Sequence, residues 1–188
     1  MNVLVLSRDE AEKLVNKYVS KRNWRLHILA VEAIMRNLAK HLGEDEELWG
    51  LTGLLHDIDF EMTEKTPERH GLEAENLLKD LVPSEVLHAI KAHNPEHTGI
   101  EPTTIMEKAL IASDAVSGLV VATALVMPSK KLREVKLDTL KRKFKDKSFA
   151  RGAKRNRIML CEELGLSLDE FLGIALESLK GISEKLGL

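Results

Sequence analysis

The chain has little cysteine and no long uncharged apolar run. Its 188 residues include a single cysteine, Cys161, which excludes an internal disulfide framework. The longest uncharged apolar stretch, Ala115 to Met127, has 13 residues, and a membrane-spanning helix needs about 20. No secretory leader pattern opens the sequence. We therefore expect a cytoplasmic protein that does not contact a membrane.

Aromatic residues are also scarce. They make up 4% of the chain, against 44% hydrophobic and 31% charged residues, a balance that excludes disorder. Strand-like alternation is confined to Val3–Leu6, and elsewhere the apolar residues recur at helical spacing. We therefore predict an all-α fold in a single compact domain over residues 1–188.

Helix boundaries are marked by local signals. Ser7-x-x-Glu10 and Ser167-x-x-Glu170 are capping boxes that predict the start of a first and a last helix. Asn23 is expected to cap a second helix, and a long apolar helix is expected over 102–126. The spacing also predicts that the basic segment continues as helix toward Leu164.

Three polar sites interrupt the predicted interior. His27 falls on an apolar helix face, Asp114 lies inside the apolar helix, and the pair His56-Asp57 ends an apolar run. An ionised or unpaired group in the interior costs several kcal/mol unless it is bound. Taken singly, His27 reads as a hydrogen-bonded core histidine, Asp114 as one partner of an ion pair, and the His-Asp pair as a solvated helix end.

A divalent metal ion accounts for all three sites together. Two imidazoles and two carboxylates form a mixed nitrogen and oxygen donor set, which suits Mn, Mg, Fe, Co, Ni or Zn. Such an ion also supplies what hydrolysis requires, because it lowers the pKa of bound water and polarises a phosphoryl oxygen.

These residues carry a resemblance to a known family. His27, then Leu54-Leu55-His56-Asp57-Ile58-Asp59, then Ala112-Ser113-Asp114-Ala115 resemble the H…HD…D signature of the HD superfamily of metal-dependent phosphohydrolases. The resemblance covers about residues 24–120, and is nearest to the HDIG-type branch of predicted hydrolases. It implies that His27, His56, Asp57 and Asp114 are metal ligands in a helical core, on which the helices of 130–188 pack. Asp59 stands where that motif has glycine.

A second set of histidines follows the first. His70 and His93 resemble the additional histidine motifs of HDIG and HD-GYP proteins, some of which hold two or three metals. The paired histidine expected after His93 is Asn94 here. We therefore expect one or two ions, with His70 and His93 in the active site.

Other charged residues are candidates for proton transfer and substrate binding. Asp59 and Glu61 follow the His-Asp pair and are candidate acids or bases, although a solvated acidic turn explains them equally well. Arg69 is a candidate phosphate ligand. From Lys130 to Arg157, 13 basic residues stand against 3 acidic ones, which indicates either a solvated face or an electropositive wall. The candidates in this basic segment are Lys143, Lys145, Lys147 and Arg151.

The sequence thus favours a metal-dependent phosphohydrolase, either phosphomonoesterase or phosphodiesterase. We expect a small phosphorylated substrate, with a nucleotide favoured and nucleic acid disfavoured because aromatic stacking residues are nearly absent. Two alternatives stay open: another metal-dependent chemistry on the same ligands, and a non-enzymatic nucleotide- or nucleic-acid-binding module with a structural metal. The sequence does not indicate the oligomeric state.

Overall fold

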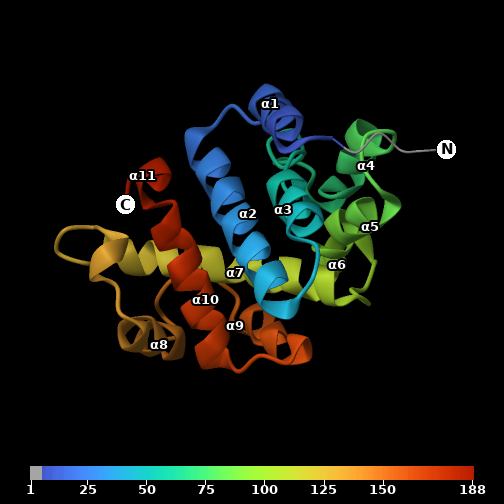
Figure 1. Cartoon of the computed structure of the whole chain (residues 1–188). Coiled ribbons are helices and arrows are strands. Elements are labelled where there is room, and N and C mark those ends of the chain that lie inside the picture. The colour runs from blue at the N-terminus through green and yellow to red at the C-terminus, as the bar shows by residue number, and fades with distance from the viewer. Residues whose placement is uncertain (1–5) are drawn as a thin grey trace.

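The computed structural model describes residues 6–188, and all regular structure in that range is helical (Figure 1). The predicted all-α class is confirmed. The α-helices are α1 Arg8–Tyr18, α2 Arg22–Leu42, α3 Glu46–Leu55, α4 Leu72–Leu78, α5 Ser84–Ala92, α6 Pro95–Thr98, α7 Ile105–Leu125, α8 Leu137–Lys145, α9 Arg155–Ile158, α10 Leu168–Gly181 and α11 Ser183–Leu186. Three 3-10 helices, η1 Pro67–Arg69, η2 Leu132–Glu134 and η3 Met159–Leu164, join them.

Helices α2 and α7 form the centre of the fold. In Figure 1, α7 crosses the molecule, and α2 and α10 lie across it. Helices α1, α3, α4 and α5 are grouped on the side of α2 that faces away from α10. Ile34 and Leu38 of α2 belong to the apolar cluster around α7 and α10. Ile28, nearer the start of α2, belongs to a second cluster with α1, α3 and α5. Helix α2 therefore contacts both halves of the core.

Helix α7 is apolar on nearly every side. Among the described residues, it is the helix that is long and apolar enough, by length and composition, to cross a membrane. However, 67% of its most apolar window is buried inside the fold, as in the core helix of a globular protein. Polar groups on this helix are therefore held within the protein.

The capping boxes at Ser7 and Ser167 are confirmed, since both show the reciprocal side-chain and backbone hydrogen bonds. The long apolar helix is also present, and Thr104 with Glu107 forms a further capping box at its start. The predicted cap at Asn23 is wrong, because α2 already begins at Arg22. The predicted alternation at 3–6 lies outside the described residues except for Leu6, whose N–H donates to the Leu81 carbonyl at 3.2 Å.

The prediction of continuous helix through the basic segment is wrong. After α8 the chain leaves helix for residues 146–154 and re-enters it only at Arg155. The Arg155 guanidinium donates hydrogen bonds to backbone carbonyls at the end of α8 and within this loop, including those of Lys143 at 3.0 Å and Ala153 at 2.7 Å. These carbonyls are satisfied by a side chain, so the loop needs no helical hydrogen bonds of its own.

Candidate metal centre

The His56-Asp57 pair is carried into the interior by α3. Residues Trp49–Leu55 of this helix are all buried, and Gly53 brings it close to α2. A Cβ added at Gly53 would lie 3.0 Å from Glu32 Cα, closer than backbone normally permits. This contact sets the end of α3 beside the first turns of α2, where His27 lies.

His56 is fully buried, and its two ring nitrogens have different surroundings. Nδ1 lies 2.7 Å from the Gly53 carbonyl oxygen. Because a carbonyl oxygen only accepts hydrogen bonds, Nδ1 carries the ring proton and Nε2 carries a lone pair. Among the described residues, Nε2 of His56 is a buried side-chain nitrogen without a hydrogen-bond partner. Such an orphaned atom costs free energy unless something binds it.

Asp57 lies at the centre of four histidines. Its Oδ2 is 3.4 Å from His56 Nε2 and 3.5 Å from His27 Nε2. Its Oδ1 is 3.2 Å from His70 Nε2 and 3.5 Å from His93 Nε2. The structure thus brings all five residues together, with one carboxylate oxygen facing each pair of rings.

Asp114 completes the group from α7. Its Oδ1 lies 3.1 Å from His27 Nε2. On the other side of the ring, His27 Nδ1 is 3.2 Å from Ser117 Oγ, and that hydroxyl donates to the Asp114 carbonyl at 2.8 Å. Ser117 therefore accepts from His27 Nδ1, which turns the Nε2 lone pair of His27 toward the two aspartates.

His70 and His93 follow the same rule. His70 Nδ1 donates to Asp59 Oδ1 at 2.9 Å, and His93 Nδ1 donates to the Ile90 carbonyl at 2.5 Å. Their Nε2 atoms are only 3.0 Å apart. All four rings thus have Nδ1 held by an acceptor and Nε2 directed at Asp57, which is the arrangement of metal-ligating histidines.

The electrostatics of the cluster call for a cation. Burial by itself would raise the pKa of Asp57, but the imidazoles of His56, His70 and His93 hold it well below its usual range. Burial likewise acts to lower the pKa of His70, yet hydrogen bonds to Asp57 and Asp59 raise it to about 10. Asp57 therefore stays ionised, and positive charge is favoured next to it.

Two groups of ligand atoms are compact enough to hold an ion. His27, His56 and Asp57 form one, and Asp57, His70 and His93 form the other; within each group the atoms lie within 4.8 Å of one another. Asp114 adjoins the first group through its contact with His27. The residues therefore fit a divalent cation, and Asp57 is shared by both groups.

A cavity of about 350 Å³ opens onto this cluster. Its wall includes two basic residues near the start of α9. Arg157 Nη1 lies 3.7 Å from Asp114 Oδ2, and Lys154 Nζ lies 2.9 Å from each carboxylate oxygen of Glu96 on α6. The cavity is lined by Trp24, His27, Asp57, Phe60, His70, His93, Asn94, Glu96, His97, Asp114, Lys154 and Arg157.

Two of the candidate catalytic residues are not brought to the cavity wall. Asp59 is fully buried, and besides His70 its carboxylate accepts from the backbone N–H groups of Gly71 at 2.7 Å and Ala74 at 3.0 Å. The half-buried Glu61 carboxylate accepts from the Ser20 backbone N–H at 2.6 Å, and Glu61 does not line the cavity. Asp59 therefore orients His70 and the start of α4, and Glu61 joins the turn before α2.

The candidate phosphate ligands also lie elsewhere. Arg69 is exposed and paired with Glu73. Lys143 lies with its ammonium 4.4 Å from the centre of the Phe149 ring. Lys145, Lys147 and Arg151 are exposed, and none of these basic side chains lines the cavity over the cluster.

Sequence reasoning counted Lys154 and Arg157 among the basic residues but did not single them out. Their spacing of three, directly before the apolar run Ile158-Met159-Leu160, is the one local signal that they share a helix face next to the core. That signal does not indicate which cavity they face, because it depends on how the loop before α9 folds back.

The chain is similar to proteins of a known family. The family model described as "HD domain" matches residues 25–119, which include all four candidate ligands of the first signature. Ribonuclease Y of Latilactobacillus sakei is 36% identical over 94 residues, 48% of this chain and 17% of that protein. Ribonuclease Y of Desulfotalea psychrophila is 27% identical over 164 residues, 85% of this chain and 31% of that protein. The chain thus spans less than a third of the length of these relatives.

The family match covers half of the chain. It begins within α2 and ends within α7, the helices that carry His27 and Asp114. The chain belongs to the HD domain family of metal-dependent phosphohydrolases.

Proposed function

We propose that this protein is a metal-dependent hydrolase that cleaves a phosphoester of a small phosphorylated substrate, with a nucleotide as the favoured class. One observation carries the proposal: four buried or half-buried imidazoles direct Nε2 at a single aspartate, and the Nε2 of His56 has no partner among the described residues. His27, His56, Asp57 and Asp114 would hold one ion, and Asp57, His70 and His93 a second.

A divalent ion supplies a Lewis acid, which lowers the pKa of a bound water and polarises a phosphoryl oxygen. Substrate binding and proton transfer are carried out by side chains of the protein. Arg157 and Lys154 present positive charge on the cavity wall next to Asp114, where it would bind the phosphate of a substrate. Glu96 holds Lys154 in this position when no anion is bound.

Proton transfer to the leaving group is assigned to His97. This residue also lines the cavity, and its Nδ1 donates to Asn94 Oδ1 at 3.0 Å. The Asn94 amide is itself oriented, because its Nδ2 donates to the His70 carbonyl at 3.3 Å. This leaves Nε2 of His97 as the ring atom free to exchange a proton with the substrate.

The size of the cavity favours a small substrate over a polymer. About 350 Å³ is near the lower end of ordinary small-molecule sites. The relatives named Ribonuclease Y make a phosphodiester of RNA the second candidate. An RNA substrate would need its backbone to run along the basic segment, in which Lys145, Lys147 and Arg151 are exposed.

The test is a hydrolysis screen with several divalent ions, covering nucleoside monophosphates, bis-p-nitrophenyl phosphate, p-nitrophenyl phosphate and a short RNA oligonucleotide. Asp57→Ala is the control for the metal centre. We expect turnover of a small phosphoester by the wild type and none by Asp57→Ala. Turnover of RNA alone would replace the small substrate by the second candidate. Metal binding without turnover of any of these compounds would support the binding-module alternative instead.

A further inference from the structure

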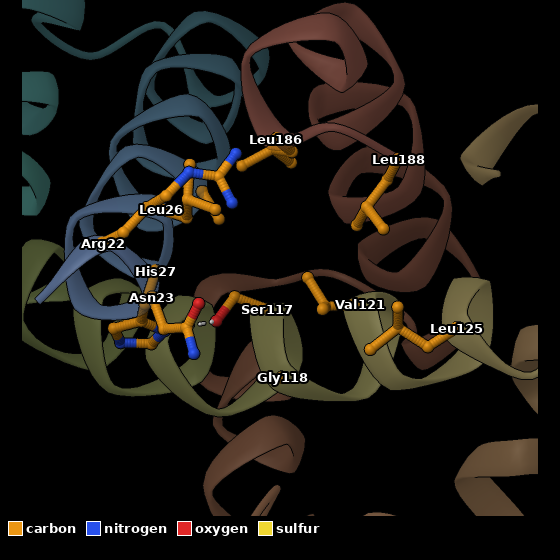
Figure 2. Close-up of a pocket in the computed structure, with 11 residues that line it drawn as sticks. Arg22, Asn23, Leu26, His27, Ser117, Gly118, Val121, Leu125, Leu186 and Leu188 are labelled. Carbon is orange, nitrogen blue, oxygen red and sulfur yellow. Dashed lines mark hydrogen bonds between the residues drawn. The ribbon is translucent and has the colours of Figure 1, made fainter. Parts of the chain in front are cut away.

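A second pocket lies behind His27, on the side of the ring away from the aspartates. It occupies about 460 Å³ between α2, α7 and the C-terminal turn at α11 (Figure 2). Its walls are mostly aliphatic, and small residues on α7 create the space. The pocket is lined by Arg22, Asn23, Leu26, His27, Ala30, Ser117, Gly118, Val121, Leu125, Leu186 and Leu188.

This pocket adjoins the metal centre. His27 borders both cavities, and Gly118 lines the pocket as well as a smaller recess of about 210 Å³ that also contacts Asp114, Lys154 and Arg157. Gly118, one helical turn after Asp114, is exposed, and a Cβ added there would meet nothing within 4 Å. The passage between the two therefore runs over an open surface at Gly118.

The pocket combines apolar walls with a polar rim. Leu26, Val121 and Leu125 present aliphatic surface, whereas the side chains of Arg22 and Asn23 stand at the edge, as Figure 2 shows. Both of these polar side chains are exposed, so they are accessible to hydrogen-bonding groups on the edge of a bound molecule. A ligand that fits must therefore offer flat apolar faces together with donors and acceptors along its edge.

A nucleoside has these properties. The faces of its base are apolar, and an asparagine amide matches the adjacent donor and acceptor of a base edge. The length of the pocket also suits a nucleoside. Gly118 and Leu125, which both line it, are seven residues apart, or about 10 Å along the helix axis at 1.5 Å per residue. An alkyl chain would contact the aliphatic walls but make no hydrogen bonds to Arg22 and Asn23 at the edge.

We infer that the pocket between α2, α7 and α11 binds the nucleoside part of the substrate, while its phosphate lies at the metal centre next to Arg157. This inference rests on the proposed function, which it deepens by assigning a base-binding site. Substrate would then span the passage at Gly118, with His27 between its two parts.

The test compares binding by two pairs of matched variants. Gly118→Leu closes the passage, and Gly173→Leu adds the same side chain in α10, where an added Cβ also meets nothing within 4 Å. Leu125→Glu places a charge in the pocket, and Val126→Glu places it on the next residue, which does not line it. Leu125 and Val126 are 49% and 53% exposed, so both substitutions leave the core intact.

Binding is measured by calorimetry on chelator-treated protein, so that no turnover occurs. The probes are the four common nucleoside 5′-monophosphates, ribose 5-phosphate and octyl phosphate. We expect at least one nucleotide to bind about tenfold more tightly than ribose 5-phosphate, and Gly118→Leu and Leu125→Glu to remove this difference. The two control variants should retain it.

Three results would overturn the inference: no nucleotide binds better than ribose 5-phosphate, octyl phosphate binds best, or each variant behaves as its control does. Hydrolysis of p-nitrophenyl phosphate by the metal-loaded variants reports separately on the proposed function. Hydrolysis without a nucleotide preference would disprove only the nucleoside pocket. A nucleotide preference without hydrolysis of any phosphoester would disprove only the enzymatic role.

Discussion

Asp59 Oδ1 lies 2.9 Å from Nδ1 of His70, and this contact links a buried carboxylate to the metal centre through one imidazole. The other oxygen of Asp59 accepts from the backbone N–H groups of Gly71 and Ala74 at the start of α4. Asp59 is therefore a positioning residue: it fixes the ring of His70 with Nε2 toward Asp57, and it holds the helix that follows.

Replacing Asp59 by Asn should weaken metal binding by about 10- to 100-fold, the usual cost of losing a partner that orients a ligating histidine. The amide has one acceptor oxygen for three donors, so the free energy of unfolding should also fall by roughly 1–3 kcal/mol. Calorimetric titration with a divalent ion and thermal unfolding measure the two effects. Glu61→Gln is the control for metal affinity, because Glu61 is a half-buried acid that bonds to Ser20 and does not line the cavity. Unchanged metal affinity in Asp59→Asn would contradict a positioning role.

Metal binding should stabilise the folded protein through His56. A ligand bound only by the native state adds about 2.7 kcal/mol at a free concentration of about 100 times Kd. We expect a divalent ion to raise the Tm of the wild type, a chelator to reverse the rise, and His56→Ala to reduce the response, because His56 belongs to one of the two ligand groups. His41→Ala is the control, because His41 is exposed at the end of α2. An equal metal-dependent rise in His56→Ala would exclude His56 as a ligand.

Under the proposed function, Arg157 binds the phosphate because it lines the cavity, whereas Lys143, Lys145 and Lys147 do not line it. Arg157→Gln should raise KM by about tenfold or more and reduce kcat less, because a charge-assisted hydrogen bond contributes about 1.5–3 kcal/mol. The triple variant Lys143→Gln, Lys145→Gln and Lys147→Gln should change KM little at moderate ionic strength. Steady-state kinetics at two salt concentrations compare them. If the triple variant has the larger effect, Lys143, Lys145 and Lys147 bind substrate, which is one of the two interpretations that the sequence left open.

The sequence was sufficient to predict features that are local or that break a pattern. The capping box at Ser7 depends on residues three apart, so a short window reveals it. His27 and Asp114 stood out because a polar residue on an apolar face requires a partner, and the structure brings the two side chains within 3.1 Å. The prediction that a divalent ion could be this partner followed from the chemistry of the imidazole and carboxylate donors.

The sequence was insufficient where a contact joins distant residues. The environment of Asp59 depends on Gly71 and Ala74, which lie more than ten residues away and follow an irregular turn. The prediction of a helix through the basic segment did not account for Arg155. Its side chain donates to backbone carbonyls at the end of α8 and in the loop that follows. Helical spacing records neither interaction, because both are decided by tertiary structure.

Glu107 should make stability depend on pH in the acidic range. Burial acts to raise its pKa, but hydrogen bonds from the Thr104 and Thr103 backbone and the His88 contact at 2.7 Å outweigh burial and lower it. A lowered pKa in the folded state adds stability above the unfolded value of about 4.5, and this stability is lost as pH falls through the folded pKa. Glu107→Gln should therefore be less stable than wild type by roughly 1–3 kcal/mol at pH 7, with the difference shrinking below pH 4.

Chemical denaturation at several pH values checks this dependence. Glu101→Gln is the control, because Glu101 is an exposed acid just before the same helix. A difference between Glu107→Gln and wild type that stays constant from pH 7 to the acidic limit would show that the carboxylate charge is not the source of the stability.

Arg155 holds the loop of residues 146–154, which carries Gly152 and Ala153 to the recess beside Asp114. Its guanidinium donates to six backbone carbonyls, those of Lys143, Phe144, Asp146, Phe149, Ala150 and Ala153. A lysine ammonium has three donors and no planar fork, so it cannot replace this set.

Arg155→Lys should therefore loosen the loop without unfolding the core, because the carbonyls it releases can turn to water. Hydrogen exchange followed by mass spectrometry should show faster exchange over residues 146–154 and little change in α2 or α7. Since the loop also positions Lys154 and Arg157, we expect KM to rise in Arg155→Lys by an amount similar to that in Arg157→Gln. Arg151→Lys, at an exposed position in the same loop, is the matched control. Equal exchange in the two variants would mean that the loop is held by its other contacts, such as the hydrogen bond from the Ala153 N–H to the Ala150 carbonyl at 2.9 Å.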